Sequence, residues 1–434
     1  MPEAPTTKTE DVDNSSNSNG NNVADKPSAS KVERGHSAPI TALELLLFAP
    51  LAVLILEGFF TIAGVGEQNF MKPDLELGSI HIPGKLVTWR LEGYSRESFS
   101  KAGWRDVERT VEKPANTYRV ALIGDSATES LQVPLEQVWA TIAEKQINQD
   151  LATAANVAAT KSKQPNKKPP HVEVINFGVS GYSTSQELLL LQKDVVKYKP
   201  DLIVVLYSRG DSDESSVDPA KYATAEPRPY FYLDQNNQLK LDRTVLLANK
   251  AKLQSNPILE YLRAHSRIYG VFDQTNFQLN LTDKFYVKLR RIYTQITEKL
   301  SGTNKLSAAE EAEQPHYPKP DSFKVTQALM TRIQNTAKAS GAHFLLLTFP
   351  DMGNIDPVFT AQLPALAKQG QAEGFDVVEL SQPFREYKGN EQLFYQVHFA
   401  SGGHKVAAQV LSQYVEKLIS EQQHAPEPKA EQSE

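Results

Sequence analysis

The chain has 434 residues, of which 40% are hydrophobic and 23% are charged, an ordinary balance for a globular protein. Its formal net charge of -6 supplies no basic face for nucleic acid, so we expect no nucleic-acid partner. The absence of cysteine excludes disulfides, thiolate metal ligands and cysteine nucleophiles, and it leaves the redox compartment open.

Both ends of the chain are polar. Residues 1–38 contain runs of Ser, Asn and Gly with almost no apolar surface to bury, and residues 421–434 are similarly polar. Such composition is typical of disorder. We therefore expect two disordered tails, of which the first is cytoplasmic if the next segment is an anchor.

Residues 39–66 form an apolar stretch, whose uncharged centre lies between Glu44 and Glu57. A membrane-spanning helix needs roughly 20 mostly apolar residues, so we expect a transmembrane signal anchor. A cleaved signal peptide and a buried helix of a soluble core stay open as alternatives. Lys31 and Arg34 precede the stretch, which predicts a single-pass protein with its main domain extracytoplasmic, in the periplasm of a Gram-negative cell.

After a lead-in segment, 67–117, apolar runs alternate with helical patterns across a main domain at 118–420. The expected strands are 118–123, 172–176, 202–206, 343–348 and 376–379, and the expected helices are 135–147, 185–198, 321–340, 357–373 and 401–419. This alternation indicates βαβ units around a parallel sheet with helices on both faces. The site of such a sheet lies at the carboxyl ends of its strands.

Low-complexity pieces interrupt the pattern. Residues 153–170 and 301–319 are predicted to be surface loops. Residues 217–320 form an insertion with aromatic residues at Tyr230–Tyr232, which we expect to cover the site or to bind a partner.

Four groups of residues carry candidate chemistry. Ser126 follows the first strand in Gly-Asp-Ser, and Gly178 follows the second. The third strand leads into Arg209-Gly210-Asp211, and His398 precedes the last helix. A serine on a strand-to-helix turn is exposed, and a histidine in reach of it can remove its proton. Each group alone is equally compatible with a tight turn, a helix cap or a structural histidine.

Taken in this order, the groups resemble the SGNH/GDSL hydrolase family, in particular a membrane-anchored bacterial subgroup. The stretches that carry the resemblance are YRVALIGDSATESLQVPLE at 118–136, VINFGVSGYSTSQELLLLQKDVVKYKPD at 174–201, and the lead-in AGWRD at 102–106. The resemblance implies an α/β fold, a three-layer α/β/α sandwich with a five-stranded, parallel, flavodoxin-like sheet. It also implies a nucleophile at Ser126, an oxyanion glycine at Gly178 and a base at His398.

Two positions depart from the family pattern. Asp211 stands where the family has the asparagine that donates to the oxyanion, and no aspartate stands two or three residues before His398. Three explanations are open: Asp211 is protonated and donates a hydrogen bond; Asp211 or Asp213 orients His398 while Arg209 replaces the donor; or the machinery has decayed.

The resemblance implies an esterase acting on O-acyl esters, O-acetyl esters among them, of an envelope or exported polysaccharide. The alternatives are a catalytically impaired relative that binds glycan or serves in a polysaccharide assembly complex, and a transferase that moves acetyl groups between carriers. We expect an acylated glycan as the partner, and neither a metal nor another cofactor, because no ligand spacing or Walker pattern is present.

Overall fold

The computed structural model describes most of the main domain and the lead-in. The described residues are 42–66, 70–161, 168–222, 225–249, 256–279, 321–352 and 356–424. The predicted N-terminal tail, the low-complexity piece at 301–319 and residues 425–434 of the predicted C-terminal tail lie outside this part of the chain.

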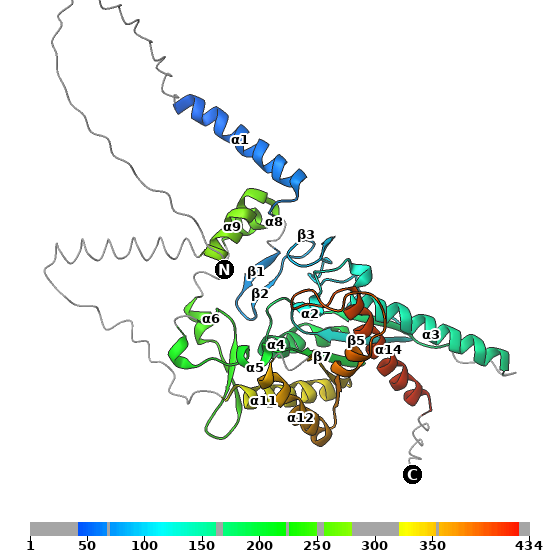
Figure 1. Ribbon diagram of the computed structural model, residues 1–434. Helices are drawn as coiled ribbons and strands as arrows, with labels where there is room; N and C mark the ends of the chain where they lie inside the picture. Colours follow the sequence, from blue (N-terminus) through cyan, green and yellow to red (C-terminus); the bar gives the residue numbers. More distant parts are fainter. Residues whose placement is uncertain are drawn as a thin grey trace, which may run out of the picture. The chain divides into compact units, whose positions relative to one another are not determined.

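A five-stranded parallel sheet forms the centre of the main domain (Figure 1). Its strands are β5 (Thr117–Ile123), β6 (His171–Asn176), β7 (Leu202–Tyr207), β10 (His343–Thr348) and β11 (Asp376–Glu379). They lie in the order β11-β10-β7-β5-β6, which is the flavodoxin-like order with its switch point between β5 and β7. All six residues of β7 are buried, as expected for a strand covered on both faces. The predicted fold class and strand order are confirmed.

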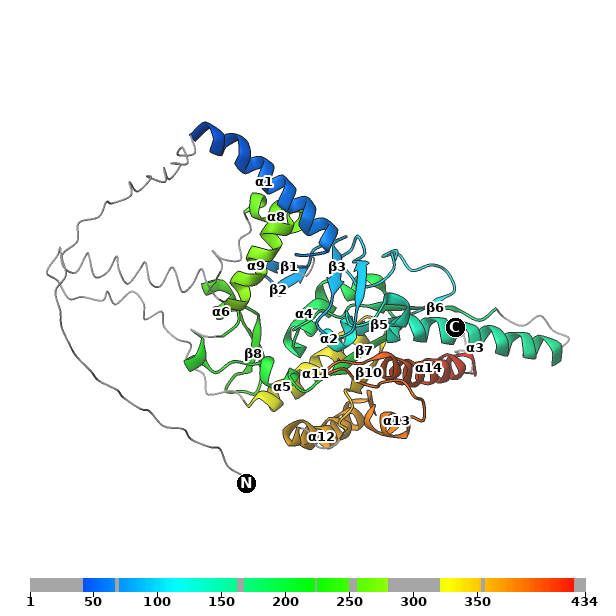
Figure 2. The same ribbon diagram turned by 45° about the horizontal axis from the view of Figure 1, so that its top comes forward.

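Helices cover the sheet in two groups, which gives the three-layer sandwich (Figure 2). One group packs α3 (Trp139–Lys161) against α14 (Ser401–His424), and the other contains α4 (Thr184–Lys193), α11 (Ser322–Ala339) and α12 (Pro357–Glu373). Helix α3 starts after a 3-10 turn at Leu135–Gln137 and continues to Lys161. The first part of the predicted loop at 153–170 is therefore helical, because its alanines favour a helix.

The lead-in forms two small hairpins. The first pairs β1 (Met71–Asp74) with β2 (Gly78–His81), and the second pairs β3 (Leu86–Trp89) with β4 (Ser95–Ser98). A small apolar cluster of Phe70, Val87, Phe99 and Leu131 packs the hairpins against the residues that follow the first sheet strand. The lead-in is thus part of the folded body rather than a linker.

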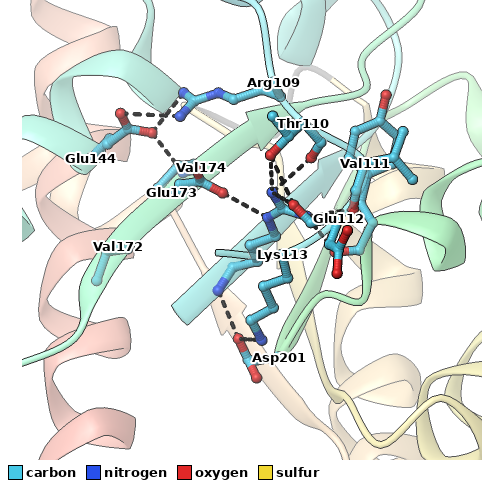
Figure 3. Close-up of polar contacts among 12 residues, drawn as sticks. Arg109, Thr110, Val111, Glu112, Lys113, Glu144, Val172, Glu173, Val174 and Asp201 are labelled. Carbon is cyan, nitrogen blue, oxygen red and sulfur yellow. Dashed lines mark hydrogen bonds and ion pairs between the residues drawn. The ribbon is translucent and has the colours of Figure 1, made fainter. Parts of the chain in front are cut away.

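Arg119 in β5 fastens the end of the lead-in to the sheet. Its buried guanidinium donates to the carbonyls of Thr110 at 2.7 Å and Val111 at 2.9 Å, and it pairs with Glu173 of β6 at 2.6 Å. Beside it, Lys113 pairs with Asp201, as Figure 3 shows. Charged hydrogen bonds of this kind are the stronger ones, so residues 109–113 are held at the amino ends of the strands.

The apolar N-terminal stretch forms helix α1 (Ala42–Ala63). The chain divides into two units, Met1–Ala52 and Val53–Glu434. Within the second unit, Glu57 accepts hydrogen bonds from the Ser266 hydroxyl at 3.0 Å and the Ile268 N–H at 3.2 Å, at the start of α9 (Arg267–Leu279). Among the residues whose side chains are described, no helix combines the length and apolarity needed to cross a membrane.

The described part of the insertion contains a hairpin and three helices. Strand β8 (Tyr230–Leu233) pairs with β9 (Leu239–Asp242), and α6 (Thr244–Ala248), α8 (Pro257–His265) and α9 follow. Tyr230 and Phe231 are buried at 5% and 7% exposure. The rings of Tyr230 and Phe231 therefore serve packing, whereas Tyr232 is half-buried.

Candidate active site

The nucleophile turn connects β5 to the short helix α2 (Ser126–Glu129). Asp125 caps this helix, accepting from the Ala127 N–H at 2.8 Å, and its other oxygen accepts from the Ser208 hydroxyl at 2.7 Å. Burial raises the pKa of Asp125, against the opposing effect of these hydrogen bonds. The turn leaves Ser126 half-buried at the carboxyl end of the sheet, as the sequence predicts.

The histidine loop delivers the base to this serine. A tight turn, closed by the Tyr395 N–H donating to the His398 carbonyl at 2.9 Å, presents the imidazole. Phe399 anchors the turn by stacking on Phe349 with ring centroids 4.8 Å apart. The Ser126 hydroxyl donates to Nε2 of His398 at 2.8 Å. The structure therefore brings together the predicted nucleophile and base, 272 residues apart in sequence.

Glu92 is the third member of the site, and the sequence reasoning missed it. Its carboxylate accepts a very short hydrogen bond from Nδ1–H of His398, and its other oxygen accepts from the N–H groups of Gln396 at 3.0 Å and Val397 at 3.2 Å. The side chain is only 10% exposed. A carboxylate on Nδ1 fixes the tautomer in which Nε2 can accept a proton.

The loop that carries Glu92 lies between β3 and β4 and depends on Gly93. Gly93 has φ +65°, and a Cβ there would lie 2.1 Å from the Gln132 carbonyl oxygen and 2.8 Å from the Tyr395 ring. Only glycine fits such a left-handed, closely approached position. A glutamate followed by a glycine between two short alternating segments is the one local signal the sequence offers, and it is a weak one.

Asp211 does not line the site, which corrects the prediction from the family pattern. Helix α5 (Asp211–Glu214) turns its carboxyl inward, where it is 2% exposed and accepts from the Ser208 N–H at 2.5 Å. Burial, reinforced by the Asp125 charge, raises the pKa of Asp211 well above its usual value. The hypothesis of a protonated Asp211 fits this direction, but the group faces the interior rather than an oxyanion.

The suggestion that Asp211 or Asp213 orients His398 is likewise wrong, because Glu92 occupies Nδ1. The residues of this loop that reach the site are Ser208, Arg209 and Gly210. The prediction missed this because a motif fixes the order of residues along a turn but not the direction in which each side chain points.

Gly178 is not among the residues that line the cavity beside Ser126. Its N–H donates to the Asn176 side chain at 2.9 Å, and a Cβ on it would lie 2.3 Å from the backbone nitrogen of Glu129. The glycine thus permits close packing of the β6 turn against α2. Among the described residues no acceptor takes the Ser126 N–H, which is therefore one backbone donor available at the cavity.

A small cavity opens beside Ser126 at the switch point of the sheet. It measures about 150 Å³ and is lined by residues that follow β5, β7 and β10 together with the histidine loop: Asp125, Ser126, Ala127, Ser208, Arg209, Gly210, Phe349, Val397 and His398. No described residue of the insertion lines this cavity, so the predicted cap is not observed there.

A buried contact between His81 and Glu129 joins the lead-in to helix α2. Nε2 of His81 lies 3.0 Å from Glu129 of α2, and its Nδ1 contacts the Gly103 carbonyl at 2.8 Å. Glu129 also accepts from the Ser180 N–H at 2.8 Å. Burial alone would raise the pKa of Glu129, but His81 and Ser180 hold it below its usual value. The carboxylate therefore stays charged and links three segments behind Ser126.

His404, near the start of α14, lies in the core. It is 1% exposed, and burial lowers its pKa to about 3. In the part of the chain that the structure describes, no group of three or more His, Asp or Glu side chains is arranged to hold a metal ion.

No model of a known protein family matches the chain, and no curated protein matches it. Solved structures that align with it include a lipase/acylhydrolase from Enterococcus faecalis, with 13% identity over 69% of this chain and 96% of that one, at a TM-score of 0.34. A catalytic mutant of an acetylxylan esterase from Geobacillus stearothermophilus aligns with 12% identity over 68% and 93%, at 0.33. A GDSL-like lipase from Bacteroides thetaiotaomicron aligns with 13% identity over 69% and 88%, at 0.31. These scores are too low to carry an argument, and the fold class rests on the chain's own sheet.

Proposed function

We propose that the protein is a serine-dependent carboxylic ester hydrolase of SGNH/GDSL type, with Ser126 as nucleophile, His398 as general base and Glu92 as the residue that orients it. The observation that carries this proposal is the continuous chain of hydrogen bonds from Ser126 through His398 to Glu92. Nucleophile, base and orienter in this geometry are the defining roles of a serine hydrolase, whatever their sequence order.

The reaction follows from these contacts. As Ser126 Oγ attacks the ester carbonyl, its proton passes to Nε2 of His398, and Glu92 stabilises the resulting imidazolium through Nδ1–H. The oxyanion is positioned at the Ser126 N–H. Collapse of the intermediate breaks the bond to the alcohol, which leaves with the proton from His398. Water then attacks the acyl-enzyme with His398 again as base, and it releases the acid and free Ser126.

The cavity favours a short acyl group. Its volume of about 150 Å³ is below the range of roughly 300–1,000 Å³ that drug-sized ligands occupy, and Phe349 and Val397 form its apolar wall. The finer proposal is that the substrate is an O-acyl, in particular O-acetyl, ester of an envelope or exported glycan. This rests on the predicted extracytoplasmic placement after the apolar N-terminal stretch and on the size of the cavity.

The first test uses the full chain. We expect hydrolysis of p-nitrophenyl acetate and covalent labelling by a fluorophosphonate probe, with the label on the peptide that contains Ser126. Ser126→Ala is expected to lose both, by about 10³-fold or more in rate. Ser98→Ala, a change at an exposed serine, is expected to keep both. A protein that neither hydrolyses the ester nor takes the label would refute the proposed function.

A separate test addresses placement. Fusion of a reporter to the C-terminus and protease treatment of spheroplasts are expected to show a membrane-associated protein whose main domain is degraded from outside. Recovery in the soluble fraction with the main domain protected would refute the predicted anchor without touching the esterase proposal.

A further inference from the structure

Arg209 introduces a positive charge into the cavity wall. It follows β7, lines the cavity that also exposes Ser126 and His398, and is half-buried. Its guanidinium carbon lies 6.0 Å from the centroid of the Phe349 ring, within the range of a cation–π contact. The aromatic ring thus holds the side chain on one wall of the cavity.

This charge has no acidic partner among the residues that the structure describes. Of the acids that follow it, Asp211 faces inward to the Ser208 N–H and Glu214 pairs with Arg228 at 2.8 Å, while Asp213 is exposed and forms no described ion pair with Arg209. Among the described residues, the one carboxyl that lines the cavity belongs to Asp125. Its two oxygens accept hydrogen bonds from the Ala127 N–H and the Ser208 hydroxyl. The guanidinium of Arg209 is therefore the group in the cavity lining that can form a charged hydrogen bond to an anion.

The topology separates the Phe349 wall of the cavity from the Ser126 wall. Ser126 follows β5, whereas Phe349 follows β10, and β7 lies between them. Neighbouring strands are about 4.8 Å apart, so the two walls are offset by roughly 10 Å across the sheet edge. An oxyanion must lie about 3 Å from the Ser126 N–H. A substrate group held against the Phe349 wall is therefore a different group from the oxyanion.

We propose that Arg209 and Phe349 form an anion subsite, and that the preferred substrates are short acyl esters that carry a carboxylate a few bonds from the scissile carbonyl. The inference rests on the proposed function and names its substrate class. The carboxylate lies either in the alcohol half, as in an acetylated acidic sugar, or in the acyl half, as in a half-ester of a dicarboxylic acid. Both present the same chemistry to a guanidinium, which binds carboxylates in a planar, two-point manner.

The kinetic test compares matched charged and neutral esters. For the alcohol half, 3-acetoxybenzoate is compared with 3-acetoxybenzamide; for the acyl half, methyl hydrogen succinate is compared with methyl succinamate. Each rate is divided by the rate of the same ester with hydroxide, which removes intrinsic reactivity. In at least one pair we expect kcat/KM for the anion to exceed that of the amide by about tenfold to a hundredfold, the range of a charged hydrogen bond.

The variants identify the residue responsible. Arg209→Gln is expected to reduce the preference for the anion over the amide to about twofold or less, mainly by raising KM for the anion. Arg209→Lys is expected to keep part of the preference for the anion, and this preference weakens as the salt concentration is raised. Arg332→Gln, at an exposed position on α11, is the control for loss of one positive charge and should leave it unchanged. The pair that shows the preference assigns the carboxylate to the alcohol half or the acyl half.

A binding measurement separates this inference from the proposed function. Ser126→Ala is expected to bind the preferred anion more tightly than its amide by NMR titration, and Ser126→Ala/Arg209→Gln to bind the two alike. Equal turnover and equal binding of both members of each pair would overturn the subsite while leaving the esterase intact. If Arg209→Gln loses turnover of the neutral ester but the anion and the amide still bind as before, the subsite is overturned. Arg209 would then act on the oxyanion instead.

Discussion

The two regions that build the candidate active site differ in kind. The carboxyl edge of the sheet supplies Ser126 and His398 from turns that regular strands and helices fix in place. The lead-in supplies Glu92 from a short loop between two four-residue strands. The first region is positioned by the sheet itself, whereas the second must be fastened to it, through Arg119, the His81–Glu129 pair and the small cluster around Phe70.

The difference teaches that the carboxylate that contacts His398 in the proposed triad can come from a segment outside the central sheet. Nδ1 of His398 needs a carboxylate within hydrogen-bonding distance, but any segment of the chain can provide that carboxylate. Here the histidine loop offers N–H groups from Gln396 and Val397 instead, and these hold the carboxylate of a distant segment. The absence of an aspartate before His398 is therefore not evidence of decay.

The largest expected effect comes from Glu92→Gln. The amide keeps the size of the side chain but removes the charge that stabilises the imidazolium and fixes its tautomer. We expect kcat for p-nitrophenyl acetate to fall by about 10²–10⁴-fold with a small change in KM, measured by steady-state kinetics.

Two controls sharpen this result. Glu112→Gln changes an exposed glutamate of the same lead-in and should retain activity. In the Glu92→Gln background, Gln396→Asp puts a carboxylate two residues before His398 and should restore part of the rate. If Glu92→Gln is as active as the native enzyme, then Glu92 only packs the loop and the triad is wrong.

The contrast between the sheet edge and the lead-in loop also explains which parts of the site the sequence could predict. The strands are recognisable because β7 (LIVVLY) and β10 (HFLLLT) are mostly apolar runs, and the order of the elements places Ser126 and His398 at one edge. Glu92 lies 306 residues from His398, and no periodicity or spacing connects them. Asp211 and Gly178 were assigned from motif order, which does not report whether a group faces the cavity or the core.

A smaller effect is expected from cutting the link between the regions at His81. His81→Phe keeps the stacking on Phe99, whose ring lies 4.2 Å away, but it leaves Oε1 of the buried Glu129 without the His81 contact. Breaking one side of a buried pair typically costs about 3–5 kcal/mol of unfolding free energy, which urea unfolding measures. The double variant His81→Phe/Glu129→Gln should recover part of this loss. Equal stability of His81→Phe and the native protein would show that the lead-in is not fastened through this pair.

The smallest expected effect is a change in stability from Asp211→Asn, at the carboxyl edge of the sheet. Because burial raises the pKa of Asp211, the folded state keeps a proton that the unfolded state releases above pH 4, so stability falls as pH rises from there toward the folded pKa. Asp211→Asn cannot ionise and should be more stable than the native protein at pH 7, by on the order of 1–2 kcal/mol, and about equal at pH 4. Thermal unfolding across this range measures the difference, with Asp213→Asn at an exposed position as control.

Ester hydrolysis by Asp211→Asn should stay within about threefold of the native rate, because the side chain faces away from the cavity. A large gain in rate would instead mean that residue 211 reaches the oxyanion. The sheet edge would then contain a third group, an aspartate that suppresses the reaction where an asparagine would donate a hydrogen bond.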